Sequence, residues 1–90
     1  MTYTLTKNKF ASYNYSYDPK FDILRANVSN NDPIYYEEVT DNILLMLNDY
    51  NDSVVGFQII NYSHVDKGEI KKSLPRDLIY VFNEIENKLK

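Results

Sequence analysis

The hydrophobic residues of this 90-residue chain change their spacing near residue 73. Before that point, apolar and aromatic side chains recur at every second position in short runs, which is the period of a half-buried β-strand. After it, they recur at intervals of three and four residues, the period of an amphipathic α-helix. An isolated helix this short is marginal in water, so its apolar stripe must lie on the sheet. The sequence therefore predicts an α+β fold, with one C-terminal helix packed on one face of an antiparallel sheet.

Four segments carry the strand pattern, and they predict a β-meander of about four strands. They are residues 13–18, 24–28, 43–47 and 54–60, and residues 34–39 show a weaker extended pattern. The run ILLML, residues 43–47, is almost continuously apolar, as expected for a central strand. Gly56 lies inside the last strand, which indicates a bulge or the close approach of another backbone.

The helical segment follows Ser73, which is a plausible N-cap, and Pro75 suits a first turn. Its apolar stripe consists of Leu74, Leu78, Val81, Phe82, Ile85 and Leu89. We expect Leu78, Val81, Phe82 and Ile85 to cover Leu45, Leu47, Phe57 and Ile59 of the sheet.

Composition limits the function classes that remain. We expect one domain over residues 1–90, with residues 1–12 loosely held. The chain has no cysteine, which fits the reducing cytoplasm, and neither a signal peptide nor an apolar run of membrane-spanning length is seen. A net charge of −3 offers no basic footprint for nucleic acid.

Candidate catalytic groups are few. Asp18 and Asp22 flank the Pro19 turn, and a carboxylate pair could perform acid/base work or bind a hard cation with Glu37. The simpler interpretation is that Asp18 stabilises the turn and Asp22 begins the next strand. The single histidine, His64, has no second histidine or cysteine with which to build a zinc site. We therefore predict no metal, no cofactor and no catalytic residues.

Tyrosine is abundant, with nine residues, as codon usage in an AT-rich genome would produce. Tyrosine is also enriched at protein interfaces. Three tyrosines, Tyr13, Tyr15 and Tyr17, share one side of their strand. If that side faces away from the helix, they would form an apolar patch with Tyr35 or Tyr36, and Glu37 and Glu38 would form its rim. These residues are the predicted partner-binding surface, for another protein or a second copy.

Charge is unevenly placed along the chain. An acidic stretch contains Asp32, Glu37, Glu38 and Asp41, and a basic stretch contains Lys67, Lys71, Lys72 and Arg76. Both stretches fit a plain solvated surface, and the acidic one also fits nucleic-acid mimicry. The third interpretation is a polarised surface that steers a charged protein partner.

Short motifs resemble those of a family of small bacterial and phage proteins known as a domain of unknown function. The resemblance rests on a strand pair with the pattern YDxxxDxL, formed by Tyr17, Asp18, Asp22 and Leu24, and on the strand VVGFQII at residues 54–60. Leu74-Pro75 matches the step that opens the family's closing helix. Two positions depart from the pattern: Asp52 stands in place of the turn glycine, and Gln58 in place of an acid. Asn51 or Asp52 must then supply any left-handed conformation in that turn.

The resemblance implies a fold and an origin in bacterial chromosomes or mobile elements, and it implies no activity. By elimination, we predict a small intracellular protein-binding module without catalysis, such as an antitoxin, an immunity protein or a phage-type inhibitor of a host defence protein. The alternative is a small metal- or ligand-dependent enzyme that uses Asp18 and Asp22.

Overall fold

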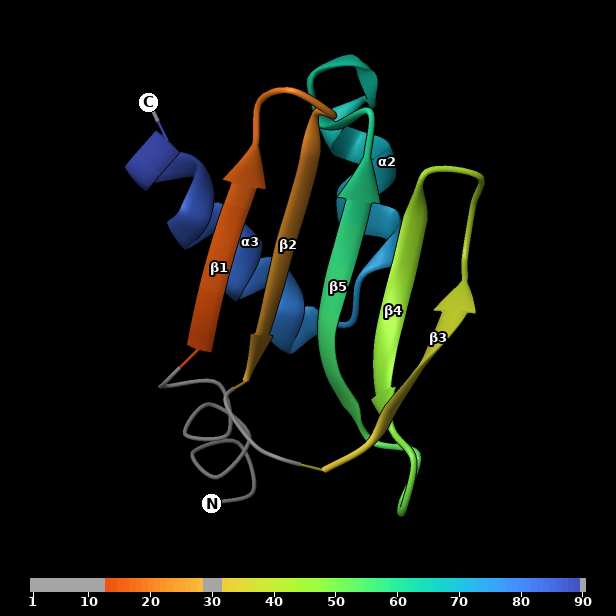
Figure 1. Cartoon of the computed structure of the whole chain (residues 1–90). Coiled ribbons are helices and arrows are strands. Elements are labelled where there is room, and N and C mark those ends of the chain that lie inside the picture. The colour runs from red at the N-terminus through yellow and green to blue at the C-terminus, as the bar shows by residue number, and fades with distance from the viewer. Residues whose placement is uncertain (1–12, 29–31, 90) are drawn as a thin grey trace.

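The computed structural model describes residues 13–28 and 32–89, which form a two-layer α+β fold (Figure 1). The predicted fold class is confirmed, and the predicted loose segment, residues 1–12, lies outside the described residues. The described strands are β1 (Tyr13–Asp18), β2 (Ile23–Val28), β3 (Ile34–Glu38), β4 (Ile43–Asn48) and β5 (Val54–Ile60). They are followed by η1 (Tyr62–His64), α2 (Lys67–Ser73) and α3 (Arg76–Leu89). None of these helices is long and apolar enough to cross a membrane.

The sheet is antiparallel throughout, with the strand order β1-β2-β5-β4-β3. This order differs from a consecutive meander, because β5 returns to pair with β2 and separates β2 from β3. As a result, the weakly patterned segment that follows β2 becomes an edge strand. Both helices lie behind the sheet in Figure 1, with α3 behind β1 and β2 and α2 near β5.

The core lies between the helices and the strands β2, β5 and β4, and Tyr13 and Tyr17 of β1 pack against its edge as partly buried residues. Phe57 of β5 meets Phe82 of α3 edge to face, with ring centroids 6.2 Å apart. Ile59, Leu78, Val81 and Ile85 are buried in the same cluster, and Leu45 packs against it as a partly buried residue. The predicted packing of the α3 stripe is thus confirmed for Phe57, Ile59 and Leu45, whereas Leu47 is buried outside this cluster.

Gly56 is required by the close approach of β2. A Cβ atom at this position would lie 2.4 Å from the carbonyl oxygen of Ala26 and 2.8 Å from the Cβ atom of Asn27. The pairing of β4 with β5 also shifts register between Met46 and Leu47, close to this glycine. Both features that the sequence predicted for Gly56 are present.

Polar residues stabilise the turns at the positions predicted from the sequence. The Oδ1 atom of Asp18 accepts hydrogen bonds from the backbone N–H groups of Lys20 at 2.9 Å and Phe21 at 3.3 Å. Asp52 takes the left-handed conformation, with φ of 61°, as expected from the missing glycine. Asp18 therefore stabilises its turn, as predicted.

Two helices replace the single predicted one. The N-cap of α2 is Asp66, whose side chain accepts a hydrogen bond from the backbone N–H of Glu69. The prediction that Ser73 caps the last helix is wrong, because Ser73 ends α2 and its hydroxyl donates to the carbonyl oxygen of Glu69. Pro75 interrupts the helical pattern, because the residue before a proline avoids helical geometry. The missed signal was Asp66-Lys67-Gly68-Glu69, an acid followed three residues later by Glu, as in a capping box.

Candidate interaction surface

The tyrosines of β1 face the helices. The hydroxyl of Tyr13 donates a hydrogen bond to Glu84 of α3. The ammonium of Lys88, also on α3, lies 5.7 Å from the ring centroid of Tyr13 and 5.6 Å from that of Tyr15. The ring of Tyr17 packs edge to face on Tyr62, with centroids 5.7 Å apart. The prediction that Tyr13, Tyr15 and Tyr17 line the open face is therefore wrong.

The reason for this error is that alternation along one strand shows which residues share a face, and leaves open which face is covered. Pairing decides the question: Tyr15 lies opposite Ala26 and Tyr17 opposite Leu24. Ala26 and Leu24 are fully buried beneath the helices, so the tyrosines paired with them lie on the same covered side.

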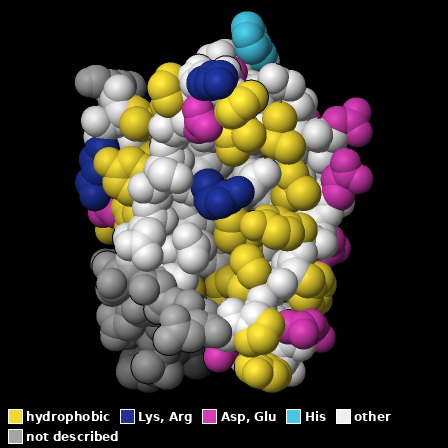
Figure 2. All heavy atoms as spheres, viewed as in Figure 1, with side chains coloured by type: hydrophobic (Ala, Val, Ile, Leu, Met, Phe, Trp, Pro, Cys, Tyr) yellow, Lys and Arg dark blue, Asp and Glu magenta, His cyan; other side chains and the backbone are white. Residues whose placement is uncertain are grey.

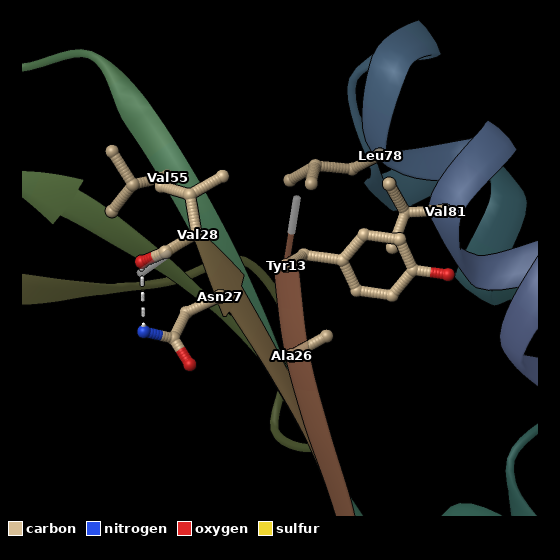
Figure 3. A pocket seen from close by; sticks show the side chains of 7 residues that line it. All are labelled: Tyr13, Ala26, Asn27, Val28, Val55, Leu78 and Val81. Carbon is tan, nitrogen blue, oxygen red and sulfur yellow. Dashed lines mark hydrogen bonds between the residues drawn. The ribbon is translucent and has the colours of Figure 1, made fainter. Parts of the chain in front are cut away.

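A narrow gap beside Tyr13 shows how closely α3 packs against this edge (Figure 3). The ring of Tyr13 lies next to Leu78 and Val81, and the gap has no room for a water molecule. Burial, together with the hydrogen bond to Glu84, raises the pKa of the Tyr13 hydroxyl. This gap is a packing feature and too small for a ligand site.

Asp22 joins the β1–β2 turn to the segment after β5. Its carboxylate accepts hydrogen bonds from the hydroxyl of Tyr17 at 2.6 Å and from the hydroxyl of Ser63 at 2.7 Å. The backbone N–H of Ser63 donates to the same carboxylate at 3.1 Å. The hydrogen bond from Tyr17, followed by that from Ser63, lowers the pKa of Asp22. These contacts hold the β1–β2 turn against the segment that follows β5.

Glu37, the third residue of the alternative catalytic set, lies far from Asp18 and Asp22. Glu37 belongs to β3, at the opposite edge of the sheet from the β1–β2 turn that holds Asp18 and Asp22. Within residues 13–28 and 32–89, no group of three or more His, Cys, Asp or Glu side chains is arranged to hold a metal ion.

The face of the sheet away from the helices carries an apolar patch over β4 and β3. Phe57 and Ile59 point into the core, so Gly56 and Gln58 of the same strand lie on the opposite face. The register then places Met46 beside Gly56 and Leu44 beside Gln58 on this open face. In the next strand, Tyr36 lies opposite Met46 and Glu38 opposite Leu44.

We name this surface the open-face patch, formed by Ile34, Tyr36, Leu44 and Met46. Ile34 and Tyr36 are 38% and 46% exposed, whereas Met46 is buried. Beside the patch, the guanidinium of Arg25 donates two hydrogen bonds to Oε1 of Gln58, at 2.8 and 3.1 Å. Figure 2, which views this face, shows hydrophobic side chains gathered over β4 and β3, a basic side chain near the centre, and acids along the margin beyond them.

Strand β3 is the most exposed element of the sheet. All five of its residues are exposed, and it lies at the end of the strand order. Tyr35 and Glu37 point to the other side of the sheet from Tyr36 and Glu38. The hydroxyl of Tyr35 donates a hydrogen bond to Asp52 at 2.8 Å, which raises the pKa of the Tyr35 hydroxyl.

The structure therefore divides the predicted partner-binding residues into two groups. Tyr35, Tyr36, Glu37 and Glu38 come together on β3, whereas Tyr13, Tyr15 and Tyr17 lie at the opposite edge. Ile34, Leu44 and Met46 were not among the residues predicted to lie on the surface. The signal was present in ILLML, because a strand that is apolar at every position needs cover on both faces.

Every charged side chain between β2 and α2 is acidic. No lysine or arginine occurs between Arg25 and Lys67, and the same interval contains seven acids. They are Asp32, Glu37, Glu38, Asp41, Asp49, Asp52 and Asp66. The basic residues Lys67, Lys71, Lys72, Arg76 and Lys88 belong to α2 and α3. Six of these acids thus lie on β3, next to its two ends or in the β4–β5 turn, and the seventh, Asp66, is the N-cap of α2.

Comparison with family models matches residues 14–63 to the family described as Protein of unknown function (DUF2283). The chain belongs to this family. The DUF2283 match contains nearly all of β1 and the whole of the other four strands, and it ends within η1, before α2. No significant match was found among the curated proteins or the solved structures.

Proposed function

We propose that this protein acts by binding another protein, without catalysis, through β3 and the adjoining open-face patch. The observation that carries the proposal is that β3 is exposed along its whole length while presenting large apolar side chains. Edge strands usually carry features that prevent pairing with other chains, such as charged side chains or proline. A long apolar edge strand without them tends to pair with another chain. Within β3, the only such feature is the pair of charged residues Glu37 and Glu38, at one end of the strand.

The open-face patch supports the same proposal. Ile34 and Tyr36 lie beside Leu44 and Met46, so the exposed edge continues into an apolar surface on the sheet. Contiguous apolar surface rimmed by polar residues is typical of protein interaction sites. Tyrosine suits such a site because its ring contributes a large contact area on few rotatable bonds.

The proposed biological role is that of an antitoxin, an immunity protein or a phage-type inhibitor of a host defence protein, acting in the cytoplasm. Each of these roles requires tight contact with one protein and no chemistry of its own. The lack of cysteine in the chain and the lack of a metal-binding group among the described residues agree with such a role.

Site-specific photo-crosslinking tests this proposal. A p-benzoylphenylalanine replaces Tyr36 in one variant and Tyr80, which is 55% exposed on α3, in a matched control. Irradiation in the native cell lysate should link one protein to the Tyr36 variant and leave the Tyr80 variant without it. An excess of unlabelled protein should compete, whereas an excess of the Tyr36→Thr variant should not. Equal capture from both positions, or equal competition by both proteins, would contradict the proposed surface.

A further inference from the structure

The backbone of β3 has a defined outward side. Val39 donates its N–H to the carbonyl of Ile43, and Asp49 donates its N–H to the carbonyl of Pro33. Because hydrogen-bonded pairs alternate along an antiparallel ladder, Tyr35 and Glu37 direct their backbone groups toward β4. Ile34, Tyr36 and Glu38 therefore direct their N–H and C=O groups to the outer edge. Among the described residues, no strand pairs with that edge.

An added strand would meet two kinds of side chain. At the start of β3, its neighbours would be Ile34, Tyr35 and Tyr36, and at the end they would be Glu37 and Glu38. Side chains directly opposite one another on an antiparallel pair lie about 4.5–5.5 Å apart at Cβ, and opposite charges there are stabilising. An incoming strand should thus carry basic residues at one end and apolar residues at the other.

A second copy of this chain is a poor occupant of the edge. Two β3 strands in antiparallel pairing centred on Tyr36 would place Glu38 of each copy opposite Ile34 of the other, and Glu37 opposite Tyr35, so that no glutamate meets a cation. No basic residue lies on β3 or in the flanking stretch between Arg25 and Lys67 to balance them. A register shifted toward the glutamates would bring them directly opposite one another, and like charges in that position are destabilising.

We propose that β3 accepts an extended, basic segment of a partner protein as a sixth, antiparallel strand. This inference rests on the proposed function and names the chemistry of the partner. The segment pairs its backbone with Ile34, Tyr36 and Glu38. Its first residues are Lys or Arg, which lie opposite Glu38 and Glu37, and its following residues are apolar or β-branched, which lie opposite Tyr36 to Ile34. Addition of a strand to an exposed edge is an established mode of peptide binding, in which the backbone provides affinity and the side chains provide specificity.

The test uses three blocked peptides titrated into the ¹⁵N-labelled chain. The first contains Lys-Lys-Val-Thr-Val, the second replaces both lysines with glutamate, and the third has the first sequence in reverse. The basic peptide should shift the amide signals of Ile34, Tyr36 and Glu38 and slow their hydrogen exchange, with weaker binding at high salt. The acidic and reversed peptides should bind more weakly.

Two charge-matched variants locate the effect. Glu37→Gln with Glu38→Gln raises the net charge by two, and so does Asn83→Lys with Asn87→Lys on the exposed side of α3. The first pair should weaken binding of the basic peptide by about twofold to thirtyfold, as expected for the loss of two exposed ion pairs. The second pair should leave it unchanged. Equal effects of the two variants would show that net charge, and not β3, attracts the peptide.

Three results overturn the inference: equal binding of the acidic peptide, equal binding of the reversed peptide, or dimerisation of the chain through β3 without any peptide. Failure of the proposed function is a separate result. If the Tyr36 crosslinker captures one protein specifically while the basic peptide fails to bind, the surface stands and the strand-addition mode is wrong. If the crosslinker captures nothing specific, the proposed function itself fails.

Discussion

The two halves of the sheet differ in what covers them. Strands β1, β2 and β5 lie against the helices, and Leu24, Phe57 and Ile59 are fully buried there. Strand β3, two strands away from β5, has no buried residue. The same chain thus builds a closed half, in which stability resides, and an open half, in which apolar side chains still face water.

The difference follows from the dimensions of the elements. Neighbouring strands lie about 4.8 Å apart, so five strands make a sheet close to 20 Å wide. An α-helix with its side chains is only about 10 Å across. The two helices α2 and α3 are short and follow one another in the chain, so together they cover the β1, β2 and β5 side. The described helices therefore do not reach across all five strands, and β3 lies outside the part that they cover.

The largest effect that would test this contrast is expected at Phe82. Phe82→Ala removes a fully buried ring that contacts Phe57 and should lower the free energy of unfolding by about 3–5 kcal/mol. Urea unfolding followed by circular dichroism measures it. Asn83→Ala, at the exposed neighbouring position, should change stability by less than about 0.5 kcal/mol. A loss below about 1 kcal/mol for Phe82→Ala would mean that α3 is not the main cover of the closed half.

Gly56→Ala should produce the next largest loss of stability, about 1–3 kcal/mol, because the new methyl group meets the backbone of β2. Gly68→Ala is the matched control in α2. There the nearest atom, at 2.9 Å, is the capping Oδ2 of the flexible Asp66 side chain, and the higher helix propensity of alanine offsets a weakened cap. The control should change stability by less than about 1 kcal/mol. Equal losses would refute the close approach of β2 and β5 as the reason for Gly56.

A smaller, pH-dependent effect on stability is expected at the Asp22 cluster, which consists of Asp22 and its hydrogen-bond donors Tyr17 and Ser63. Its pKa is lowered in the folded chain, first by the hydrogen bond from Tyr17, so the cluster stabilises the fold at neutral pH. That stabilisation should disappear as the pH falls below the ordinary value of 3.8 and through the folded pKa. Asn tolerates the left-handed conformation that Asp22 adopts, with φ of 56°. Asp22→Asn should thus be less stable than the unaltered chain at pH 7.

Urea unfolding of both proteins between about pH 2 and pH 7 measures this difference, which should shrink toward the acid end. Asp41→Asn, at an exposed position outside the cluster, is the charge-matched control and should show no such trend. A difference between Asp22→Asn and the unaltered chain that stays constant with pH would show that the lowered pKa contributes nothing to stability.

The smallest effect on stability is expected in the open half. Tyr36→Thr replaces an exposed side chain with a good strand former and should change the free energy of unfolding by less than about 0.5 kcal/mol. Binding to the captured partner should weaken in the same variant by roughly 1–3 kcal/mol, measured by titration calorimetry. A large loss of stability together with unchanged binding would reverse the roles assigned to the two halves.

Much of the closed half could be predicted from the sequence. The period-two runs gave β1, β2 and β5, and the stripe from Leu78 to Ile85 gave the buried face of α3. These predictions succeed because burial on one face leaves a periodic pattern. Asp18 and Gly56 were also interpreted correctly, because turn geometry and close backbone approach each demand a particular residue type.

The open half could be predicted only in part. Tyr35, Tyr36, Glu37 and Glu38 were placed on a candidate surface, but they were joined to the tyrosines of β1. That error arose because strand order depends on pairing between distant segments, here β2 with β5, which no local pattern records. Strands β1 and β3 lie at opposite edges of the sheet. Alternation within each strand cannot indicate that Tyr15 faces the helices while Tyr36 faces away from them.

The position of β3 also determines how the molecule can open. Among the described strands, β3 pairs its backbone with β4 alone, and the Tyr35 hydroxyl adds one hydrogen bond to Asp52 in the β4–β5 turn. Detaching this strand would break its ladder but leave the Phe57–Phe82 core intact, so its opening should require less free energy than global unfolding. The β4 amides that donate hydrogen bonds to β3 should then exchange through this local opening. The amides of β5 should exchange only when the whole molecule unfolds. A segment that opens on its own also exposes the edge of β4, and a bound sixth strand would hold both β3 and β4 closed.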